Sequence, residues 1–583
     1  MVERSSASLI ENKSGAHRHV ILDSRRLPVA LVQAQSAVDA RDWPQARSLL
    51  SGSGLAEAER FLQAEATRID IPYLVGRLYR SLGSAADAER WFQRALQSER
   101  HPLILQELAS LYRATGHPTQ AAQYRREALA KAPEDSDIRL ACGLDLLRIG
   151  QIREGLDLLR DVVDSDPTHA DAYSKWLFHA QYLPEIDPEE LAHEHRRWGQ
   201  RHAPLHRART RHVRGRDPHR RLRVGYLSPD FCRHSVAYTF EPILAGHDRT
   251  TVEVFGYGNV ESPDDVTERL TDLFDRYLDI TRWDDREAAE RIDRDEIDIL
   301  VNLAGHVGGH RIGVLAYKPA PIQVDWGGQA TLGLPQVEYR LTDRYLDPPE
   351  TQRLYTERFV PLPSGFHIYA PQSDAPAVSD LPAARTGVVT FGSFNNRVKI
   401  NDATLGLWAQ VLQEVPHARL LLKFQGGNDR TVQQGLRQHL DRYGIAPERI
   451  GIIGFVPRRE AMALYGEVDI GLDPYPFNGC ATTLESLWMG VPVVTLVGPR
   501  PVARAGLSLL APLGLSLCVA HRPEAYVAKA KALADNLPAL ARLRAGLRQR
   551  VVTSSLCDTS NHVREIEASY RTMWQTWCRA SHD

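Results

Sequence analysis

The chain has 583 residues, of which 43% are hydrophobic and 25% are charged. This length predicts three or four packed domains, and this apolar content excludes a disordered or collagen-like chain. Lys and Arg number 71 against 73 Asp and Glu. Because this balance provides no net attraction for polyanions, we expect no nucleic-acid partner.

The cysteines and the apolar segments indicate where such a chain would work. The six cysteines are far apart and form no CxxC pair, which argues against a disulfide framework or a structural zinc site. The sequence has no apolar run of about 18 residues and no signal-peptide pattern at its start. We therefore expect a cytoplasmic protein with no transmembrane segment.

The N-terminal part contains a repeat with a period of about 34 residues. Its three clearest copies read GRLYRSLGSAADAERWFQRAL, ASLYRATGHPTQAAQYRREAL and GLDLLRIGQIREGLDLLRDVV, with turn glycines at Gly83, Gly116 and Gly150. Small residues recur where two paired helices would cross, so the pattern predicts stacked helix pairs and resembles tetratricopeptide repeats. We predict an N-terminal tail over residues 1–25 and an all-α superhelix over 26–200, with an ordinary helical bundle as the alternative.

A segment dense in Arg and His follows the repeats. It runs over residues 193–223 and favours a solvated helix face followed by a basic linker at 201–220. The alternative is a patch that contacts anions.

The rest of the chain alternates short apolar strands with helical periodicity, which predicts parallel sheets covered by helices. The pattern stops at a Pro- and Ala-rich gap and then restarts, so we predict two Rossmann-like lobes. The expected boundaries are a first lobe at 221–370, an interlobe linker at 371–386, a second lobe at 387–556 and a C-terminal helix at 557–583. Two such lobes place a ligand between them, at the carboxyl ends of their strands.

One candidate side chain lies in the first lobe. His234 follows the strand LRVGYLS within SPDFCRHSV, immediately before a helix that Ser235 would cap. A histidine at the carboxyl end of a strand can act as a base near neutral pH. The alternative is a structural or surface histidine.

The second lobe contains a junction that suits a phosphorylated ligand. In DPYPFNGCATTLESLWMG a strand ends and a helix begins near Ala481. The free N–H groups of that helix, with the hydroxyls of Thr482 and Thr483, suit a diphosphate. Glu485 either completes a capping box or binds two ribose hydroxyls, and its spacing leaves both open.

Basic residues stand on two other loops of this lobe. Asn396 and Lys399 follow the strand VVTF, and Arg458 follows a later strand. A lysine at this position can neutralise departing phosphate charge, although an isolated loop lysine is also typical of a solvated surface. Neither lobe has a Walker loop or a GxGxxG motif, so nucleotide hydrolysis and dinucleotide chemistry lack support.

The order of these motifs resembles the O-linked N-acetylglucosamine transferase family, particularly its bacterial members. The resemblance rests on the repeats followed by SPDFCRHSV, VNLAGH, PAPIQVDWGGQATLG, FNNRVKI and DPYPFNGCATTLESLWMGVPVVTL. It implies two lobes of the GT-B type that bind UDP-N-acetylglucosamine, and repeats that guide protein acceptors.

The resemblance also implies a role for each matched residue. These roles are a base or sugar contact for His234, a sugar contact for Gly328 and a phosphate contact for Lys399. Asn396 matches a nearby polar position of the nucleotide-sugar site. Cys480, Ala481, Thr482 and Thr483 make the diphosphate turn, Glu485 binds the ribose and Arg458 lies near the uridine. Ala461, Cys480 and Ala481 depart from the animal members, so donor selection can differ.

The sequence thus predicts an inverting transfer of N-acetylglucosamine from UDP-N-acetylglucosamine to Ser/Thr hydroxyls of proteins, with no metal and no cofactor. One alternative keeps the fold and uses GDP-fucose or UDP-glucose. The other is a tetratricopeptide scaffold with an inactive transferase region.

Overall fold

A computed structural model describes residues 27–65, 67–209, 212, 215–371 and 374–580. The predicted N-terminal tail and parts of both predicted linkers lie outside the described residues. The chain divides into two compact units, Met1–Ile149 and Gly150–Asp583, each with its own packing.

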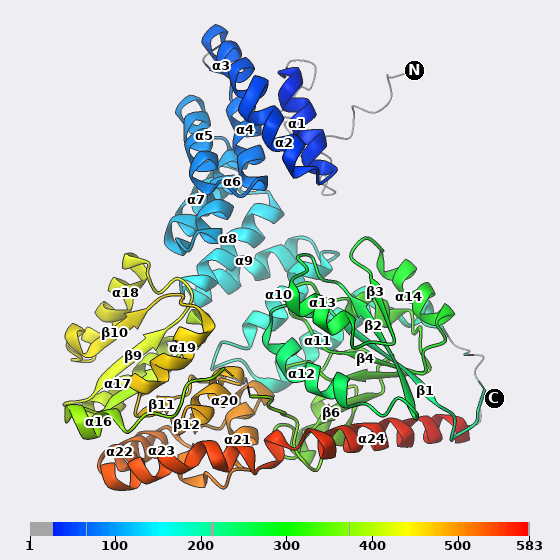
Figure 1. The fold of residues 1–583 in the computed structure, drawn as a ribbon, viewed down its shortest axis with the longest axis vertical. Coiled ribbons are helices and arrows are strands. Elements are labelled where there is room, and N and C mark those ends of the chain that lie inside the picture. Colours follow the sequence, from blue (N-terminus) through cyan, green and yellow to red (C-terminus); the bar gives the residue numbers. More distant parts are fainter. Residues whose placement is uncertain (1–26, 66, 210–211, 213–214, 372–373, 581–583) are drawn as a thin grey trace. The chain divides into compact units, whose positions relative to one another are not determined.

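The described part of the first unit is built from helices (Figure 1). They are α1 (Val29–Asp39), α2 (Trp43–Leu49), α3 (Leu55–Ala64), α4 (Asp70–Ser81), α5 (Ala85–Ser98), α6 (Pro102–Ala114), α7 (Pro118–Lys131) and α8 (Ser136–Arg148).

Close helix crossings confirm the predicted repeats. Gly83 and Gly116 have φ of 80° and 83° at the turns after α4 and α6, a conformation that favours glycine. A Cβ atom at Gly76 would lie 2.6 Å from the ring of Phe92, which is fully buried on α5. The small residue at this repeat position is therefore required by the distance between α4 and α5.

We expect Gly76→Ala to lower the free energy of unfolding of this unit by about 1–3 kcal/mol, because the methyl group overlaps the Phe92 ring. Gly546→Ala is the matched control. Gly546 lies on a helix of the second unit with nothing within 4 Å of the added Cβ, so alanine should stabilise that helix by about 0.5–1 kcal/mol. Urea denaturation of each variant tests the pair, and equal effects would contradict the crossing argument.

The second unit begins with three further helices, and the last of them packs on the first lobe. They are α9 (Ile152–Ser165), α10 (Ala170–Ala180) and α11 (Pro188–His202). A Cβ atom at Gly199 would collide with the carbonyl oxygen of Gly333, and the Gln336 amide donates to the Ala203 carbonyl oxygen at 2.8 Å. The boundary between the compact units therefore lies inside the predicted repeat region 26–200.

A group of buried and half-buried histidines lies where α11 meets the loop after strand β4 (Ile299–Asn302). Trp198 packs edge-on against His306 at 4.9 Å between ring centroids, and His195 lies 4.8 Å from the same imidazole. Burial lowers the pKa of His195 to about 3 and that of His310 and His202 to about 4. These side chains are therefore neutral at physiological pH.

We expect acid to destabilise the second unit. The unfolded imidazoles titrate near pH 6.5, well above their pKa in the folded state, so the unfolded chain gains protons first as the pH falls. The free energy of unfolding should then fall by up to about 1.4 kcal/mol per pH unit for each histidine. Urea denaturation between pH 7.5 and 5.5 measures this slope. His195→Phe should reduce it, and an unchanged slope in that variant would contradict the assignment.

The first lobe is a parallel sheet of seven described strands in the order β3-β2-β1-β4-β5-β6-β7. The strands are β1 (Leu222–Ser228), β2 (Val252–Gly258), β3 (Arg276–Asp279), β4 (Ile299–Asn302), β5 (Ile322–Asp325), β6 (Tyr339–Thr342) and β7 (Arg358–Pro361). The helices between them are α12 (Ser235–Gly246), α13 (Asp265–Thr271), α14 (Asp285–Arg294) and α15 (Ile312–Ala316). In the register of this sheet, Val224 of β1 pairs with Val254 and Ile299. All three side chains are fully buried, as expected for a sheet covered on both faces.

The second lobe is a parallel sheet of six described strands in the order β10-β9-β8-β11-β12-β13. The strands are β8 (Thr390–Ser393), β9 (Arg419–Lys423), β10 (Ile450–Ile453), β11 (Ile470–Leu472), β12 (Val493–Leu496) and β13 (Val519–Ala520). Its helices are α16 (Pro382–Thr386), α17 (Asp402–Glu414), α18 (Arg430–Asp441), α19 (Arg458–Leu464), α20 (Ala481–Trp488), α21 (Ala505–Leu510), α22 (Pro523–Ala534) and α23 (Leu537–Val552). In each sheet the first strand in the sequence lies inside the sheet, and later strands are added on both sides of it. The fold class predicted from the sequence is therefore confirmed.

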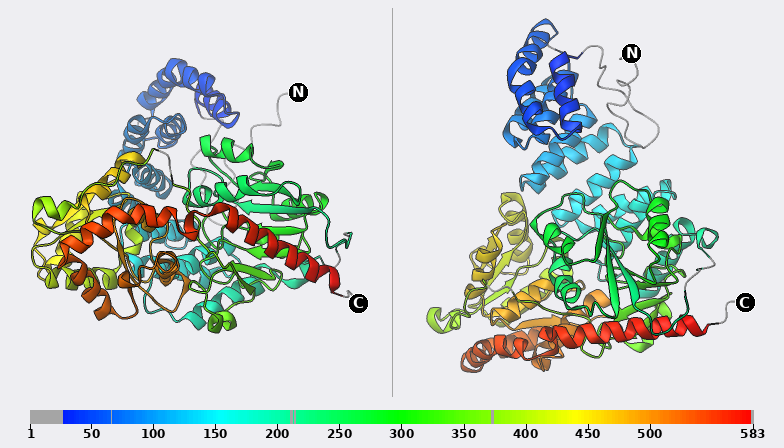
Figure 2. Two further views of the ribbon diagram at one scale, coloured as in Figure 1. Left: turned by 60° about the horizontal axis from the view of Figure 1, so that its bottom comes forward. Right: turned by 45° about the vertical axis from the view of Figure 1, so that its right-hand side comes forward.

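The last helix, α24 (Thr559–Arg579), returns to the first lobe (Figure 2). Ile566 and Trp574 belong to the same buried cluster as Val224 of β1. The Glu567 carboxylate accepts from His247 at 2.8 Å. The C-terminal segment therefore completes the core of a lobe that begins more than 300 residues earlier.

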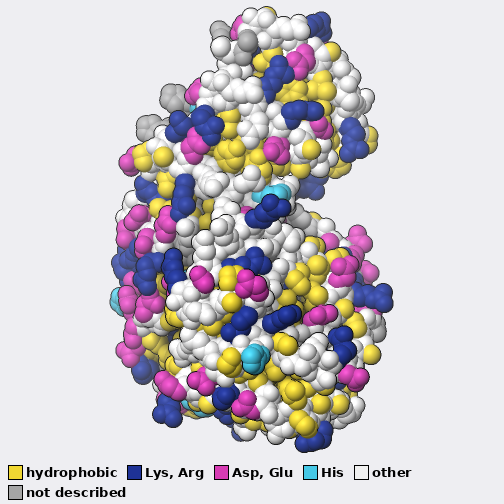
Figure 3. Space-filling model, turned by 90° about the vertical axis from the view of Figure 1, so that its left-hand side faces the viewer, with side chains coloured by type: hydrophobic (Ala, Val, Ile, Leu, Met, Phe, Trp, Pro, Cys, Tyr) yellow, Lys and Arg dark blue, Asp and Glu magenta, His cyan; other side chains and the backbone are white. Residues whose placement is uncertain are grey.

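Charges of both signs share the surface. On the face drawn in Figure 3, Lys and Arg side chains are interspersed with Asp and Glu. None of the helices in the described part of the chain combines the length and hydropathy that a bilayer crossing requires.

Candidate nucleotide-sugar site

Lys399 ends a short 3-10 turn, Arg397–Lys399, just after β8. Its Nζ donates to the Asn478 carbonyl oxygen at 2.7 Å and lies 4.5 Å from the centre of the Phe477 ring. Burial lowers the pKa of Lys399 to about 8, although the nearby Asp473 opposes this shift. The lysine is therefore an under-compensated cation that an incoming phosphate would stabilise.

A rigid turn connects β11 to α20 beside this lysine. Asp473 accepts from the Gly479 backbone N–H at 2.6 Å and from the Thr495 hydroxyl at 2.7 Å. Burial raises the pKa of Asp473 to about 7. A Cβ atom at Gly479 would lie 2.6 Å from the Thr483 hydroxyl oxygen, so only glycine fits this turn.

The tip of α20 provides free backbone donors. Cys480 is its N-cap residue, and the described contacts include no side-chain cap and no acidic residue in the first turn. The Thr482 hydroxyl donates to Asn395 Oδ1 at 3.1 Å. Unpaired N–H groups at the positive end of a helix dipole form an anion site, and here they lie on the same turn as the carbonyl that Lys399 contacts.

The structure contradicts the capping-box interpretation of Glu485. The N-cap is Cys480, so Glu485 lies two residues beyond the third helical position that a capping box requires, and its carboxylate accepts from Arg458 at 3.3 Å. Burial raises the pKa of Glu485, while the charges of Arg458 and Lys423 lower it. The carboxylate thus pairs with Arg458 and not with the backbone of the N-cap residue.

Arg458 also contacts the first lobe. Its guanidinium lies 4.3 Å from the centre of the Tyr238 ring on α12. Beside this contact is a cavity of about 490 Å³ lined by residues of both lobes, among them Tyr238, Glu241, Pro242, Arg269, Ala370 and Arg458. Arg458, which pairs with Glu485, therefore borders a space between the lobes that is large enough for a nucleoside.

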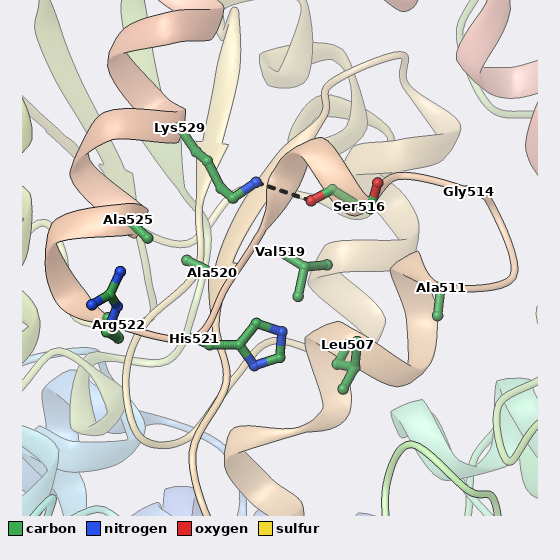
Figure 4. A pocket seen from close by; sticks show the side chains of 10 residues that line it. All are labelled: Leu507, Ala511, Gly514, Ser516, Val519, Ala520, His521, Arg522, Ala525 and Lys529. Carbon is green, nitrogen blue, oxygen red and sulfur yellow. Dashed lines mark hydrogen bonds between the residues drawn. The ribbon is translucent and has the colours of Figure 1, made fainter.

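A second open cavity, of about 570 Å³, lies away from this site (Figure 4). It is lined by α21, β13 and α22, and Lys529 within it donates to the Ser516 carbonyl oxygen at 3.1 Å. The residues that line it include none of the predicted site residues.

His234 is itself the N-cap of α12, and Ser235 is the first helical residue, so the predicted cap was wrong by one position. The imidazole Nδ1 accepts weakly from the Val236 N–H and lies 3.5 Å from Asp230 Oδ1. Burial raises the pKa of Asp230, and His234 opposes this shift. The His234 side chain is 46% exposed, so substrates can reach it.

Gly328 lies on the loop after β5, in close contact with its own chain. A Cβ atom there would lie 2.6 Å from Asp325 Oδ2 and 2.9 Å from the Ala330 carbonyl oxygen. Arg340 holds this loop by donating to Asp325 at 2.7 Å and to Asp347 at 2.8 Å, all three being buried. These contacts within the loop require glycine at position 328 even without a bound ligand.

The structure brings most of the second-lobe candidates onto one edge of the sheet. Lys399 contacts the turn that leads through Cys480 and Ala481 to Thr482, and Glu485 contacts Arg458. Asn396 is exposed at the start of the 3-10 turn. The contacts described above for His234 and Gly328 are with first-lobe residues.

Several polar residues beside these were not predicted. Asn395, Lys423 and Asp230 each lie within two residues of the carboxyl end of a strand. This position in the sequence could have identified them as candidates. Tyr238 and His367 offer no such signal. The described residues contain no group of three or more His, Cys, Asp or Glu side chains placed to hold a metal ion.

Twin parallel lobes with a lysine, a free helix tip and a carboxylate at one sheet edge define a GT-B type glycosyltransferase. The sequence profile of glycosyl transferase family 41 matches residues 192–376 and 377–566. The chain belongs to this family.

Named relatives agree with this assignment. Proteins called probable UDP-N-acetylglucosamine–peptide N-acetylglucosaminyltransferase SPINDLY are 37% identical in Petunia hybrida and 38% identical in Solanum lycopersicum, each over 419 residues. These matches cover 71% of this chain and 45% of each relative, so the chain spans less than half of their length. The solved structure of a mutant O-GlcNAc transferase from Thermobaculum terrenum is 35% identical, with a TM-score of 0.81, and the match covers 88% of this chain and 98% of that one.

Proposed function

We propose that this chain transfers N-acetylglucosamine from UDP-N-acetylglucosamine to Ser/Thr hydroxyls of proteins, with inversion and without a metal ion. The contact of Lys399 with the turn at the tip of α20 is the observation that carries the proposal. A cation and a row of free N–H groups at one place suit two linked phosphates. The names of the relatives provide the sugar and the type of acceptor.

Charge neutralisation at the leaving group is the main catalytic contribution in this scheme. When the bond between the sugar and the diphosphate breaks, negative charge grows on UDP. Protonated Lys399 and the N–H groups near Thr482 are placed to stabilise that charge. These fixed donors supply the stabilisation that a metal ion supplies in other nucleotide-sugar enzymes, so the transfer proceeds without one.

The acceptor hydroxyl attacks from the face opposite UDP, which inverts the anomeric carbon. His234 is the residue proposed to take its proton, with Asp230 at 3.5 Å orienting the imidazole. Gly328 and its buried loop border the sugar, Glu485 binds the ribose and Arg458 lies beside the base. Asn396, on the exposed start of the lysine turn, faces the phosphates.

The repeats are proposed to hold the protein acceptor. The first unit has an open cavity of about 450 Å³ lined by Tyr79, Trp91, Arg90, Arg94 and Glu59 among others. Aromatic and charged side chains together suit an extended polypeptide.

The test is transfer from UDP-N-acetylglucosamine to a serine-containing peptide in the presence of EDTA, followed by mass spectrometry. GDP-fucose and UDP-glucose serve as competing donors in parallel reactions. We expect a mass increase of one N-acetylhexosamine that EDTA does not prevent, and a released or transferred sugar of inverted configuration by NMR. Preferred transfer from either competing donor, or a requirement for a metal, would refute the proposal.

A further inference from the structure

A cysteine and a histidine from different lobes meet at the tip of α20. Cys480 Sγ lies 3.4 Å from His367 Nδ1, and 113 residues separate the two in the sequence. His367 follows β7 in the first lobe and is 8% exposed, whereas Cys480 is half-buried at the start of α20. His367 Nε2 is buried and has no hydrogen-bond partner among the described residues.

The surroundings of this pair favour charge separation. Burial raises the pKa of the Cys480 thiol, but His367 and Lys399 together lower it to a net value below the usual range. Burial lowers the pKa of His367, but Cys480 raises it to a net value above the usual range. The N-terminal end of a helix adds to the stabilisation of a thiolate.

The other cysteines have the opposite environment. Burial raises the pKa of Cys232, Cys518, Cys557 and Cys578, and Cys142 is fully buried. Because the thiolate is the reactive form of cysteine, the structure distinguishes Cys480 from the remaining thiols of this chain.

We propose that Cys480 is a modification site at which peroxides close the donor site. The inference rests on the function proposed above, because Cys480 belongs to the turn proposed to hold the diphosphate. In the reaction, the thiolate sulfur attacks one peroxide oxygen, so that an S–O bond forms and the O–O bond breaks. Sulfur is oxidised to sulfenic acid and the peroxide is reduced. The leaving hydroxide takes the proton of His367 and departs as water.

The product changes the space available in the site and not its net charge. The added oxygen occupies space at the tip of α20 where a phosphate oxygen would bind. The reaction removes the negative charge of the Cys480 thiolate together with the proton of His367, so the net charge of the site stays the same. The added oxygen therefore weakens the binding of a diphosphate by occupying its space, and thiol reductants reverse this because sulfenic acid is reducible.

The first experiment measures reactivity alone. Full-length protein is treated with hydrogen peroxide at pH 7 in the presence of dimedone, and the labelled cysteine is identified by peptide mass spectrometry. We expect Cys480 to be labelled at least about 10-fold faster than any other cysteine, and His367→Asn to slow this labelling by about the same factor. Cys557→Ser is the control and should leave it unchanged. Equal labelling of the four half-buried cysteines, or no effect of His367→Asn, would overturn the proposal.

The second experiment measures UDP binding by calorimetry before and after peroxide. We expect the affinity of the wild type to fall at least about 10-fold and to return after dithiothreitol, whereas Cys480→Ser should keep its own untreated affinity. Retained binding in fully oxidised protein would overturn the closure of the site. Untreated protein that does not bind UDP would instead refute the proposed function, while labelling in the first experiment would still decide the reactivity of Cys480.

Discussion

Lys399→Ala is expected to lower turnover at least about 100-fold while the protein remains folded, as is found when a preorganised charge stabiliser is removed. At pH 7, below its pKa of about 8, this lysine is mostly protonated and can place a positive charge beside the proposed leaving group. Its loss leaves the backbone N–H groups of α20 alone to stabilise UDP. Initial rates with saturating donor measure the effect.

The fold should tolerate this substitution because burial of Lys399 opposes its charge. Its pKa falls from 10.5 in the unfolded chain to about 8 in the folded state. Below pH 8 the folded protein therefore carries the ammonium group at a cost in stability, which alanine removes. Lys529→Ala is the matched control, since Lys529 also donates to backbone carbonyls but lies in the other cavity. Near wild-type turnover of Lys399→Ala, or an equal loss in Lys529→Ala, would contradict the scheme.

Arg340→Met is expected to reduce the free energy of unfolding by about 3–5 kcal/mol. The guanidinium is completely buried between Asp325 and Asp347, so methionine leaves two buried carboxylates without their cation. The same arginine donates to the loop that contains Gly328. Urea denaturation measures the loss, and limited proteolysis should show faster cleavage of the loop.

An exposed ion pair offers the control for this prediction. Arg353 pairs with Glu189 at 2.5 Å, and both side chains are nearly two-thirds exposed. Arg353→Met removes the same guanidinium group but should change the free energy of unfolding by less than about 1 kcal/mol. If Arg340→Met and Arg353→Met lowered the free energy of unfolding by similar amounts, burial of the Arg340 ion pairs would not explain their contribution to stability.

The architecture could be predicted because it depends on periodicities that the sequence displays. The repeat glycines Gly83 and Gly116 have the positive φ that their turns require. The destination of the last helix could not be predicted, because an amphipathic face such as that of Ile566 shows that a partner exists but not which one. The packing of α11 on the first lobe at Gly199 and Gly333 could not be predicted either, because the repeat pattern does not contain this contact.

The candidate site could also be predicted only in part. Lys399 and Thr482 could be located because the carboxyl ends of parallel strands meet at one edge. The starts of two helices were placed one or two residues too late. Ser235 and Thr482 have the usual capping chemistry, but the N-cap residues are His234 and Cys480. The contact of Cys480 with His367 depends on the packing of one lobe on the other, which neither strand nor helix patterns encode.

Proton uptake on UDP binding tests the central claim most directly. If Lys399 has a pKa near 8 in the free protein and is fully protonated beside the diphosphate, binding at pH 8 should take up about half a proton through this residue. Titration calorimetry in two buffers of different ionisation enthalpy measures this number, and Lys399→Ala should lower it by the same amount. UDP binding with identical proton uptake in wild type and Lys399→Ala would contradict the claim that this lysine receives the phosphates.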